Sequence, residues 1–371
     1  MNQIYNLCAL PQKKRNVDKK NLAIIRHNCI RRHFRQRKVE TMDKVKVVLY
    51  GVGAVGSLIA KLILEKEGIE IVGAIDVAKE KVGKDLGDVL ALDKQLGIKV
   101  SHDPDAVLSK VEADIVVHTT TSFLKQTYQQ IVKVIEHGAN VVSTCEELAY
   151  PYLKAPEIAK KLDELAKKHG VTVLGTGINP GFIMDTLLIA LTGVCQKVET
   201  IKMTRVIDAA KRRASFQNKI GIGLTVDEFK EKIERKAITG HVGIEESVSM
   251  TASALGWELD TIEVTTDAVR AKSGRVAGLR QLARGIRNKE RITFDLQAYV
   301  GAEKEYDSIA IEGVPSIHAR ISPGIHGDIA TVAIVVNSIP KAINAAPGLV
   351  TMKDLPVPSA VLEDMRTYVK R

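Results

Sequence analysis

The clearest hydrophobic pattern in the chain is a β-branched run, a helical periodicity and a second β-branched run in immediate succession. Residues 45–50 read VKVVLY, long enough for one buried strand, and they meet a glycine-rich stretch without a spacer. Apolar residues then recur on one face of a predicted helix, at Leu58, Ile59, Leu62 and Ile63. A second strand is expected over residues 71–75, so this stretch predicts a strand–helix–strand unit.

The same alternation continues along the chain. Short apolar runs predict strands over 114–118, 140–143 and 171–174, and amphipathic helices are expected after the first two of them. Strands that alternate with helices in this way form a parallel sheet with helices on its faces. The pattern therefore predicts an α/β fold whose first domain covers residues 42–183 and is built on a parallel sheet.

Beyond Asp185 the pattern changes to longer strands in which polar and apolar residues alternate. Strands are expected at Val198–Ile207, Asp260–Val269, Arg291–Val300 and Ser308–Arg320, and helices at Val226–Ala237 and Ile244–Leu255. This order predicts an α+β substrate and oligomerisation domain over 184–328, built on a largely antiparallel sheet. The apolar run from Ile329 predicts a helix with Asp328 at its start, and residues 329–371 are expected to pack back on the first domain.

Basic residues are concentrated at the N-terminus. Residues 1–42 hold eleven Lys and Arg against Asp18 and Glu40, whereas the net charge of all 371 residues is +10, so the remaining chain is nearly neutral. A nearly neutral body disfavours nucleic acid as a partner. We expect residues 1–41 to be a disordered basic leader and Met42 to be the functional beginning, because the leader matches neither a secretory signal nor a Ser-rich transit peptide.

Cysteine usage indicates the compartment. Cys145 and Cys195 are the cysteines of the body, and neither belongs to a CxxC pair or to a group with metal-ligand spacing. This usage predicts a cytoplasmic protein with reduced thiols and no metal site. No apolar run is long enough to span a membrane, so no membrane association is expected.

The glycine-rich stretch GVGAVG, residues 51–56, carries the first chemical signal. Gly51 allows a tight turn, Gly53 lets the backbone approach a pyrophosphate, and Gly56 lets the helix pack closely on its strand. With Ala54 and Val55 it opens the predicted helix, whose N–H groups and dipole attract an anion. The flanking strand and helix favour a dinucleotide site over a simple turn, so the α/β fold of residues 42–183 is predicted to be a Rossmann-type dinucleotide-binding domain.

An acid at the end of the second strand extends this site. Asp76 follows Gly56 by twenty positions and is placed to accept a hydrogen bond from a ribose 2′-hydroxyl, which favours NAD. Its charge would repel the 2′-phosphate of NADP, but Lys79 and Lys81 lie close enough in sequence to weaken that preference. The expected cofactor is therefore NAD or NADP.

Polar residues follow the later strands of the predicted parallel sheet, where ligands bind in open α/β folds. Thr119 and Thr120 are expected to contact the cofactor, although the same hydroxyls also suit the start of a helix. A structural role is favoured for the neighbouring His118. Asn179, in the sequence GTGINPGF, is placed to bind the nicotinamide carboxamide, although Asn-Pro-Gly is also a good turn.

Two adjacent acids after the 140–143 strand are the candidate catalytic groups. A carboxylate there would stabilise an iminium or ammonium charge and move protons, as hydride transfer involving a C=N bond requires. Adjacent side chains point in different directions, so one of the pair is expected to face the cleft. Glu146 is favoured over Glu147, and a helix-start acid is the alternative for both.

Candidates for substrate binding lie further along the chain. Arg212 and Arg213, in the basic loop KRRASFQ, are able to hold a carboxylate, although a solvated charged face explains them equally well. His326, in SPGIHGD, is either a cleft residue or a structural histidine in a turn.

Taken together, several segments resemble the 2,4-diaminopentanoate dehydrogenases and related native amine dehydrogenases, whose fold is similar to that of dihydrodipicolinate reductase. The segments are GVGAVG, VVHTTTSF, NVVSTCEEL, GTGINPGFIMD, KRRASFQNKIG and SPGIHGDIATVA. The resemblance runs from Met42 to Pro356, and the CEEL and NPGFIMD segments are its specific part.

The resemblance implies a homodimer or higher homo-oligomer that deaminates the 4-amino group of 2,4-diaminopentanoate, giving 2-amino-4-oxopentanoate and ammonia, in ornithine degradation. It implies NAD or NADP at the Gly51–Gly56 turn, and it maps the family's strand-end glutamate to Glu146, with Glu147 not excluded. Alternatives are a dihydrodipicolinate reductase-like or other carbonyl or imine reductase, and a non-catalytic NAD-sensing module.

Overall fold

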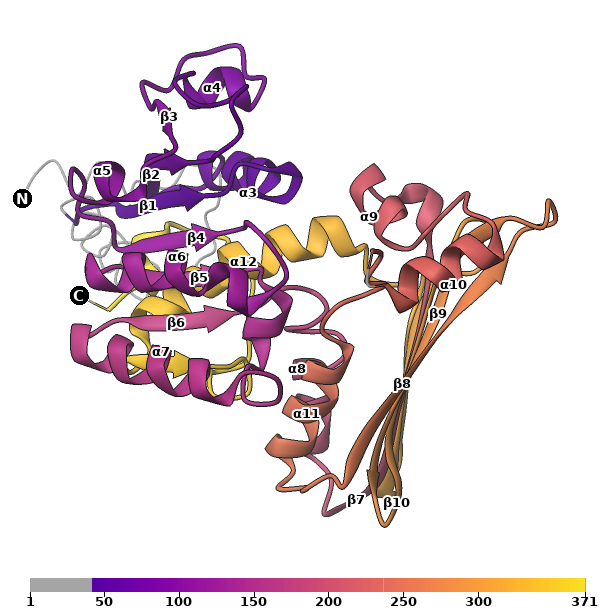
Figure 1. Cartoon of the computed structure of the whole chain (residues 1–371). Helices are drawn as coiled ribbons and strands as arrows, with labels where there is room; N and C mark the ends of the chain where they lie inside the picture. The colour runs from indigo at the N-terminus through magenta and orange to yellow at the C-terminus, as the bar shows by residue number, and fades with distance from the viewer. Residues whose placement is uncertain (1–41, 236, 371) are drawn as a thin grey trace, which may run out of the picture.

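A computed structural model describes residues 42–235 and 237–370, in two sheets and the helices around them (Figure 1). The predicted leader, residues 1–41, lies outside the described residues. Among the helices of the described chain, none has the length and apolar character needed to cross a membrane.

The first sheet has seven strands, and every neighbouring pair in it is parallel. In spatial order the strands are β13 (Gly348–Val350), β6 (Thr172–Gly175), β5 (Asn140–Ser143), β4 (Ile115–His118), β1 (Val45–Tyr50), β2 (Ile69–Ile75) and β3 (Val100–Ser101). The flanking helices are α3 (Ala54–Leu64), α4 (Leu86–Val89), α5 (Pro104–Leu108), α6 (Leu124–Glu136), the 3₁₀ helix η1 (Glu146–Ala149) and α7 (Pro156–His169). The predicted α/β class with a Rossmann-type sheet is confirmed, and β1 between β2 and β4 marks the point where ligands bind in such sheets.

The second sheet has six strands and is seen nearly edge-on in Figure 1. In spatial order they are β12 (Ile317–Ile321), β11 (Tyr306–Val314), β7 (Lys197–Asp208), β10 (Lys289–Tyr299), β9 (Val276–Arg287) and β8 (Thr261–Arg270). All neighbouring pairs are antiparallel except the central β7–β10 pair, which is parallel. The accompanying helices are α8 (Thr186–Thr192), η2 (Ala209–Lys211), α9 (Ala214–Lys219), α10 (Val226–Glu234) and α11 (Ile244–Ala254).

One strand of this sheet was predicted wrongly from the sequence, and one was not predicted. The single strand expected over Ser308–Arg320 is the hairpin of β11 and β12, because Pro315 has no N–H to donate to a ladder and interrupts the run. Strand β9 was missed: of its inward residues, Gln281, Ala283 and Gly285 are small or polar and only Leu279 is a large apolar residue, while Leu282 and Ile286 lie on the other face, so the period-two signal is weak.

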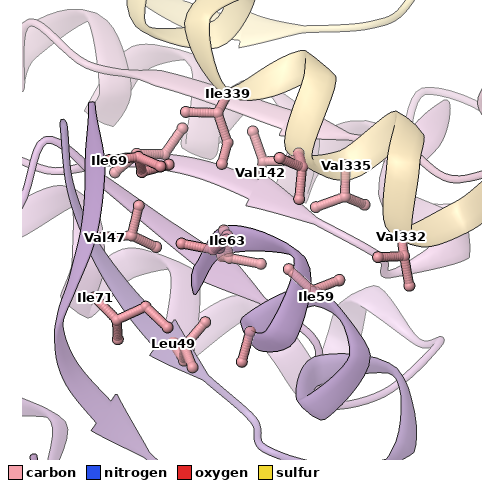
Figure 2. Close-up of a cluster of buried hydrophobic side chains, with 14 of the residues drawn as sticks. Val47, Leu49, Ile59, Ile63, Ile69, Ile71, Val142, Val332, Val335 and Ile339 are labelled. Atoms are coloured by element: carbon pink, nitrogen blue, oxygen red, sulfur yellow. The ribbon is translucent and has the colours of Figure 1, made fainter. Parts of the chain in front are cut away.

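Helix α12 (Gly327–Asn344) joins the two sheets. Its N-terminus lies near α9, and its middle packs on α3 beside the first sheet (Figure 1). Val332, Val335 and Ile339 share a buried cluster with Ile59 and Ile63 of α3, as Figure 2 shows. The chain ends with the short 3₁₀ helix η3 (Met365–Tyr368), whose Met365 belongs to the same cluster. The first turn of α12, including Asp328, is thereby held near the second sheet while the rest of the helix is anchored on the first.

Candidate active site

A cavity of about 330 Å³ lies between the carboxyl edge of the first sheet and the inner face of the second. We call it the inter-sheet cavity. Residues singled out in the sequence line it from the glycine turn, the loops after β4, β5 and β6, and the start of α9: Gly53, Ala54, Val55, Thr119, Thr120, Glu146, Asn179, Arg212 and Arg213. The same surface thus combines the expected nucleotide turn with the expected ionisable groups.

The glycine turn is shaped for a diphosphate. Gly51 has φ +100°, and a Cβ on Gly56 would lie 2.2 Å from the carbonyl oxygen of Gly51, so turn and helix are in close contact. A Cβ on Gly53, in contrast, would meet nothing within 4 Å. Gly53 is the N-cap residue of α3, and no side chain of the described chain caps the helix. Open space over a helix N-terminus with free backbone approach fits the pyrophosphate of a dinucleotide.

Asp76, at the end of β2, anchors the turn from the other side. Its Oδ2 accepts from the N–H of Val52 at 2.8 Å, and its Oδ1 accepts from the N–H of Ala78 at 2.9 Å. Lys81 lies 3.1 Å from Oδ2. Burial opposes ionisation, but the hydrogen bonds from Ala78, Val52 and Lys81 outweigh it and lower the pKa of Asp76. The Asp76 side chain is therefore a charged carboxylate in the folded protein.

Of the two threonines after β4, Thr119 closes the turn and Thr120 does not contact it. Thr119 Oγ1 donates to the carbonyl oxygen of Gly51 at 2.7 Å, which ties the ends of β1 and β4 together. Thr120 Oγ1 donates to Gln130 Oε1 at 2.7 Å. His118 contacts Ser143 and Gln130 through its two ring nitrogens, and burial lowers its pKa to about 4. His118 is therefore a neutral imidazole with both ring nitrogens hydrogen-bonded, which agrees with the structural role predicted for it from the sequence.

Glu146 and Glu147 point to different neighbours. The Glu146 side chain lines the inter-sheet cavity, and its Oε1 lies 3.2 Å from Lys219 Nζ at the end of α9. Glu147 Oε2 instead accepts from the N–H of Leu124, the first residue of α6, at 2.7 Å. Glu147 thus stabilises a helix N-terminus, and Glu146 is the acid that a ligand in the cavity can contact.

The basic loop forms a charged cluster with α12. Arg212 donates to both carboxylate oxygens of Asp328 through Nε and Nη2, each at 3.0 Å, and Arg213 also donates to Asp328. Burial works against ionisation of Asp328, but the two guanidinium groups keep its pKa lowered. His326 accepts from the N–H of Ile329 as the N-cap of α12 and does not line the cavity.

Sequence reasoning missed three further cavity residues, Arg205, Lys219 and His241. Arg205, on β7, is almost fully buried, and its Nη1 lies 3.3 Å from Asp307 Oδ1. His241 Nε2 accepts from Asn179 Nδ2 at 2.7 Å. Burial, reinforced by the nearby Lys219, lowers the pKa of His241 to about 3. No separate sequence signal marks them: Arg205 reads as one polar position of an alternating strand, Lys219 lies in the segment KRRASFQNKIG without a role of its own, and His241 reads as a loop residue.

Asn179 has one unused hydrogen-bonding atom. While its Nδ2 contacts His241, its Oδ1 is buried without a hydrogen-bond partner among the described residues. A buried carbonyl oxygen without a donor is unfavourable, so it points to a ligand N–H at this end of the cavity. In the part of the chain that the structure covers, no group of three or more metal-ligating side chains is found.

Comparison with known proteins agrees with this arrangement. Residues 182–371 match the family described as 2,4-diaminopentanoate dehydrogenase C-terminal domain, and residues 45–176 match dihydrodipicolinate reductase, N-terminus. A 2,4-diaminopentanoate dehydrogenase of Acetoanaerobium sticklandii is 39% identical over 347 residues, which cover 88% of this chain and 98% of that protein. The two matched ranges together cover nearly all of the described residues.

Two amine dehydrogenases are also similar. That of Streptomyces virginiae is 26% identical over 284 residues, 75% of this chain and 77% of its own length. The structure of amine dehydrogenase from Mycobacterium smegmatis superposes with a TM-score of 0.76 at 30% identity, covering 86% of this chain and 98% of that one. The resemblance found in the motifs is confirmed: the chain belongs to the 2,4-diaminopentanoate dehydrogenase family and is an NAD(P)-dependent oxidoreductase.

Proposed function

We propose that this protein catalyses the NAD(P)-dependent oxidative deamination of the 4-amino group of 2,4-diaminopentanoate, giving 2-amino-4-oxopentanoate and ammonia, and the reverse reductive amination. The distribution of charge in the inter-sheet cavity carries this proposal. Among its lining residues Glu146 is the sole acid, beside the nucleotide turn, whereas Arg205, Arg212, Arg213 and Lys219 are cationic. A substrate with an amine that reacts and a carboxylate that is held suits this arrangement.

The carboxylate end of the substrate would be held by the arginine cluster. Asp328 is shared by Arg212 and Arg213, so one negative charge faces two positive ones and a positive charge remains for a ligand. Planar guanidinium groups bind carboxylates through paired hydrogen bonds. In this proposal Asp328 is a positioning residue, because it orients both arginines and need not touch the substrate.

The amine end would lie at Glu146. Loss of hydride from the amine-bearing carbon leaves an iminium ion, whose positive charge a nearby carboxylate stabilises. One water then adds to that carbon, and Glu146 accepts a proton from it and returns this proton to the nitrogen. The carbon–nitrogen bond then breaks and ammonia leaves as the hydroxyl proton passes to Glu146 and the carbon–oxygen double bond forms; Glu146 finally releases that proton to solvent. Lys219, 3.2 Å from Glu146 and 3.4 Å from Ser122 Oγ, holds the carboxylate in place.

The cofactor would be held by residues of the glycine turn, of the end of β2 and of the loops that line the inter-sheet cavity. The Gly51–Gly56 turn fits the pyrophosphate, Asp76 the adenosine ribose, and Thr119 and Thr120 border the nicotinamide end. The unpartnered Oδ1 of Asn179 suits the N–H of a carboxamide. When bound, NAD(P)⁺ supplies the acceptor for the hydride. In this role the enzyme would serve ornithine degradation in the cytoplasm as a homodimer or higher homo-oligomer.

The test mixes the purified full-length protein with 2,4-diaminopentanoate and either NAD⁺ or NADP⁺, and follows absorbance of the reduced nicotinamide together with ammonia release. We expect equal amounts of both products. In reverse, oxidation of the reduced cofactor by 2-amino-4-oxopentanoate should require ammonia. Reduced-cofactor consumption that is independent of ammonia, or reaction with a cyclic imine but not the diamine, would contradict the proposal in favour of a carbonyl or dihydrodipicolinate-type reductase.

A further inference from the structure

The loop after β2 brings a lysine back onto the acid expected to contact the adenosine ribose. Ala78 donates its N–H to Asp76 Oδ1, and the N–H of Lys81 donates to the carbonyl oxygen of Ala78 at 2.9 Å. These two bonds fold the loop over Asp76, and Lys81 Nζ reaches Oδ2 of the same carboxylate at 3.1 Å. The ion pair therefore follows from the backbone path of the loop.

This contact changes what Asp76 can do. A carboxylate excludes NADP by presenting an uncompensated negative charge to the 2′-phosphate. Here Oδ2 already accepts from Val52 and from Lys81, and the charges of Asp76 and Lys81 cancel as a pair. The side chains of Lys81 and Asp76 are 23% and 10% exposed, so the lysine side chain is the more accessible of the two. A phosphate group that approaches this ion pair can therefore contact Lys81 more readily than Asp76.

We propose that Lys81 determines the cofactor specificity of this protein by providing the binding site for the 2′-phosphate of NADP. With NAD⁺, Lys81 remains on Asp76, which accepts the ribose hydroxyl. With NADP⁺, the flexible lysine side chain turns from Asp76 to the phosphate, an interaction between fully charged groups. The protein then binds both cofactors, although it carries the acid that is typical of NAD sites.

The test is equilibrium binding by calorimetry with the full chain and no amine, so its outcome does not depend on the proposed reaction. The ligands are NAD⁺, NADP⁺, adenosine 5′-monophosphate and adenosine 2′,5′-bisphosphate. We expect the unsubstituted protein to bind NADP⁺ within about tenfold of NAD⁺. Lys81→Gln should weaken NADP⁺ and the bisphosphate about tenfold or more, and change NAD⁺ by less than about threefold.

Two further variants separate this role from general effects. Lys81→Arg keeps the charge and should retain NADP⁺ binding, which also checks that position 81 tolerates substitution. Lys79→Gln removes the same charge from an exposed position of the same loop and should leave the ratio of the two affinities unchanged. The inference is overturned if Lys81→Gln weakens both dinucleotides equally or neither, if Lys79→Gln has the same effect, or if the unsubstituted protein rejects NADP⁺ by more than about 100-fold.

Discussion

The adjacent acids Glu146 and Glu147 allow a prediction in which activity and stability separate between neighbouring positions. Glu146→Gln removes the carboxylate that lines the inter-sheet cavity, whereas Glu147→Gln makes the same chemical change at the acid that contacts the N–H of Leu124. Glutamine is nearly isosteric with glutamate, so each variant tests the charge and proton-accepting ability of its position. We expect the first change to lower turnover and the second to lower stability.

The expected magnitudes follow from these contacts. General acid–base catalysis by one group contributes about 10²–10⁴ in rate, so Glu146→Gln should lower kcat by at least about 100-fold, or roughly 3 kcal/mol. The ion pair of Glu146 with Lys219 is partly exposed, and losing it should cost at most about 1 kcal/mol of stability. Glu147→Gln retains an oxygen for the Leu124 N–H and loses the charge at the start of α6, worth about 0.3–1 kcal/mol.

The assay compares initial rates of nicotinamide reduction at saturating diamine and cofactor, thermal unfolding by circular dichroism, and NAD⁺ binding by calorimetry. For Glu146→Gln we expect normal NAD⁺ binding and a nearly unchanged Tm. For Glu147→Gln, kcat should stay within about threefold, and Tm should fall by up to about 4 °C. The reasoning is refuted if Glu146→Gln retains more than about a third of kcat, or if Glu147→Gln lowers kcat as strongly.

Two further predictions concern the nucleotide turn and the buried histidines. Gly53→Ala should fold normally, because its Cβ meets nothing within 4 Å, but it should weaken NAD⁺ binding about tenfold. Gly56→Ala places a Cβ 2.2 Å from the Gly51 carbonyl oxygen and should lower the free energy of unfolding by about 1–3 kcal/mol, seen as a lower Tm. Equal Tm values for the two variants would contradict this prediction. The pKa values of His118 and His241 are lowered from 6.5 to about 4 and about 3, so below pH 6.5 the unfolded state takes up protons that the folded state does not. Stability should therefore fall as the pH falls from about 7 to 5, and His118→Asn should make that fall less steep in thermal melts recorded across this range.

Much of the fold could be predicted because its signals are local. A helical periodicity and a run of β-branched residues are both visible within a few positions of the sequence, and so are the glycines whose positive φ at Gly51 and close contact between Gly51 and Gly56 shape the turn. The predicted strand at Val198–Ile207 corresponds closely to β7, Lys197–Asp208. Strand β9 was not predicted because its inward residues after Leu279 are small or polar, so the burial of that part of the strand depends on the neighbouring strands more than on its own sequence.

The sequence by itself determined the class of fold, the family and the presence of acids and arginines in suitable loops. Only the tertiary structure decided that Glu146 lines the cavity while Glu147 contacts α6, and that Arg205, Lys219 and His241 meet there. The physical reason is that these side chains come from β7, α9 and the loop before α11, which approach one another only when the second sheet packs on its helices. Likewise, Asp328 reaches Arg212 because α12 is anchored on the first sheet, a contact that no local pattern encodes.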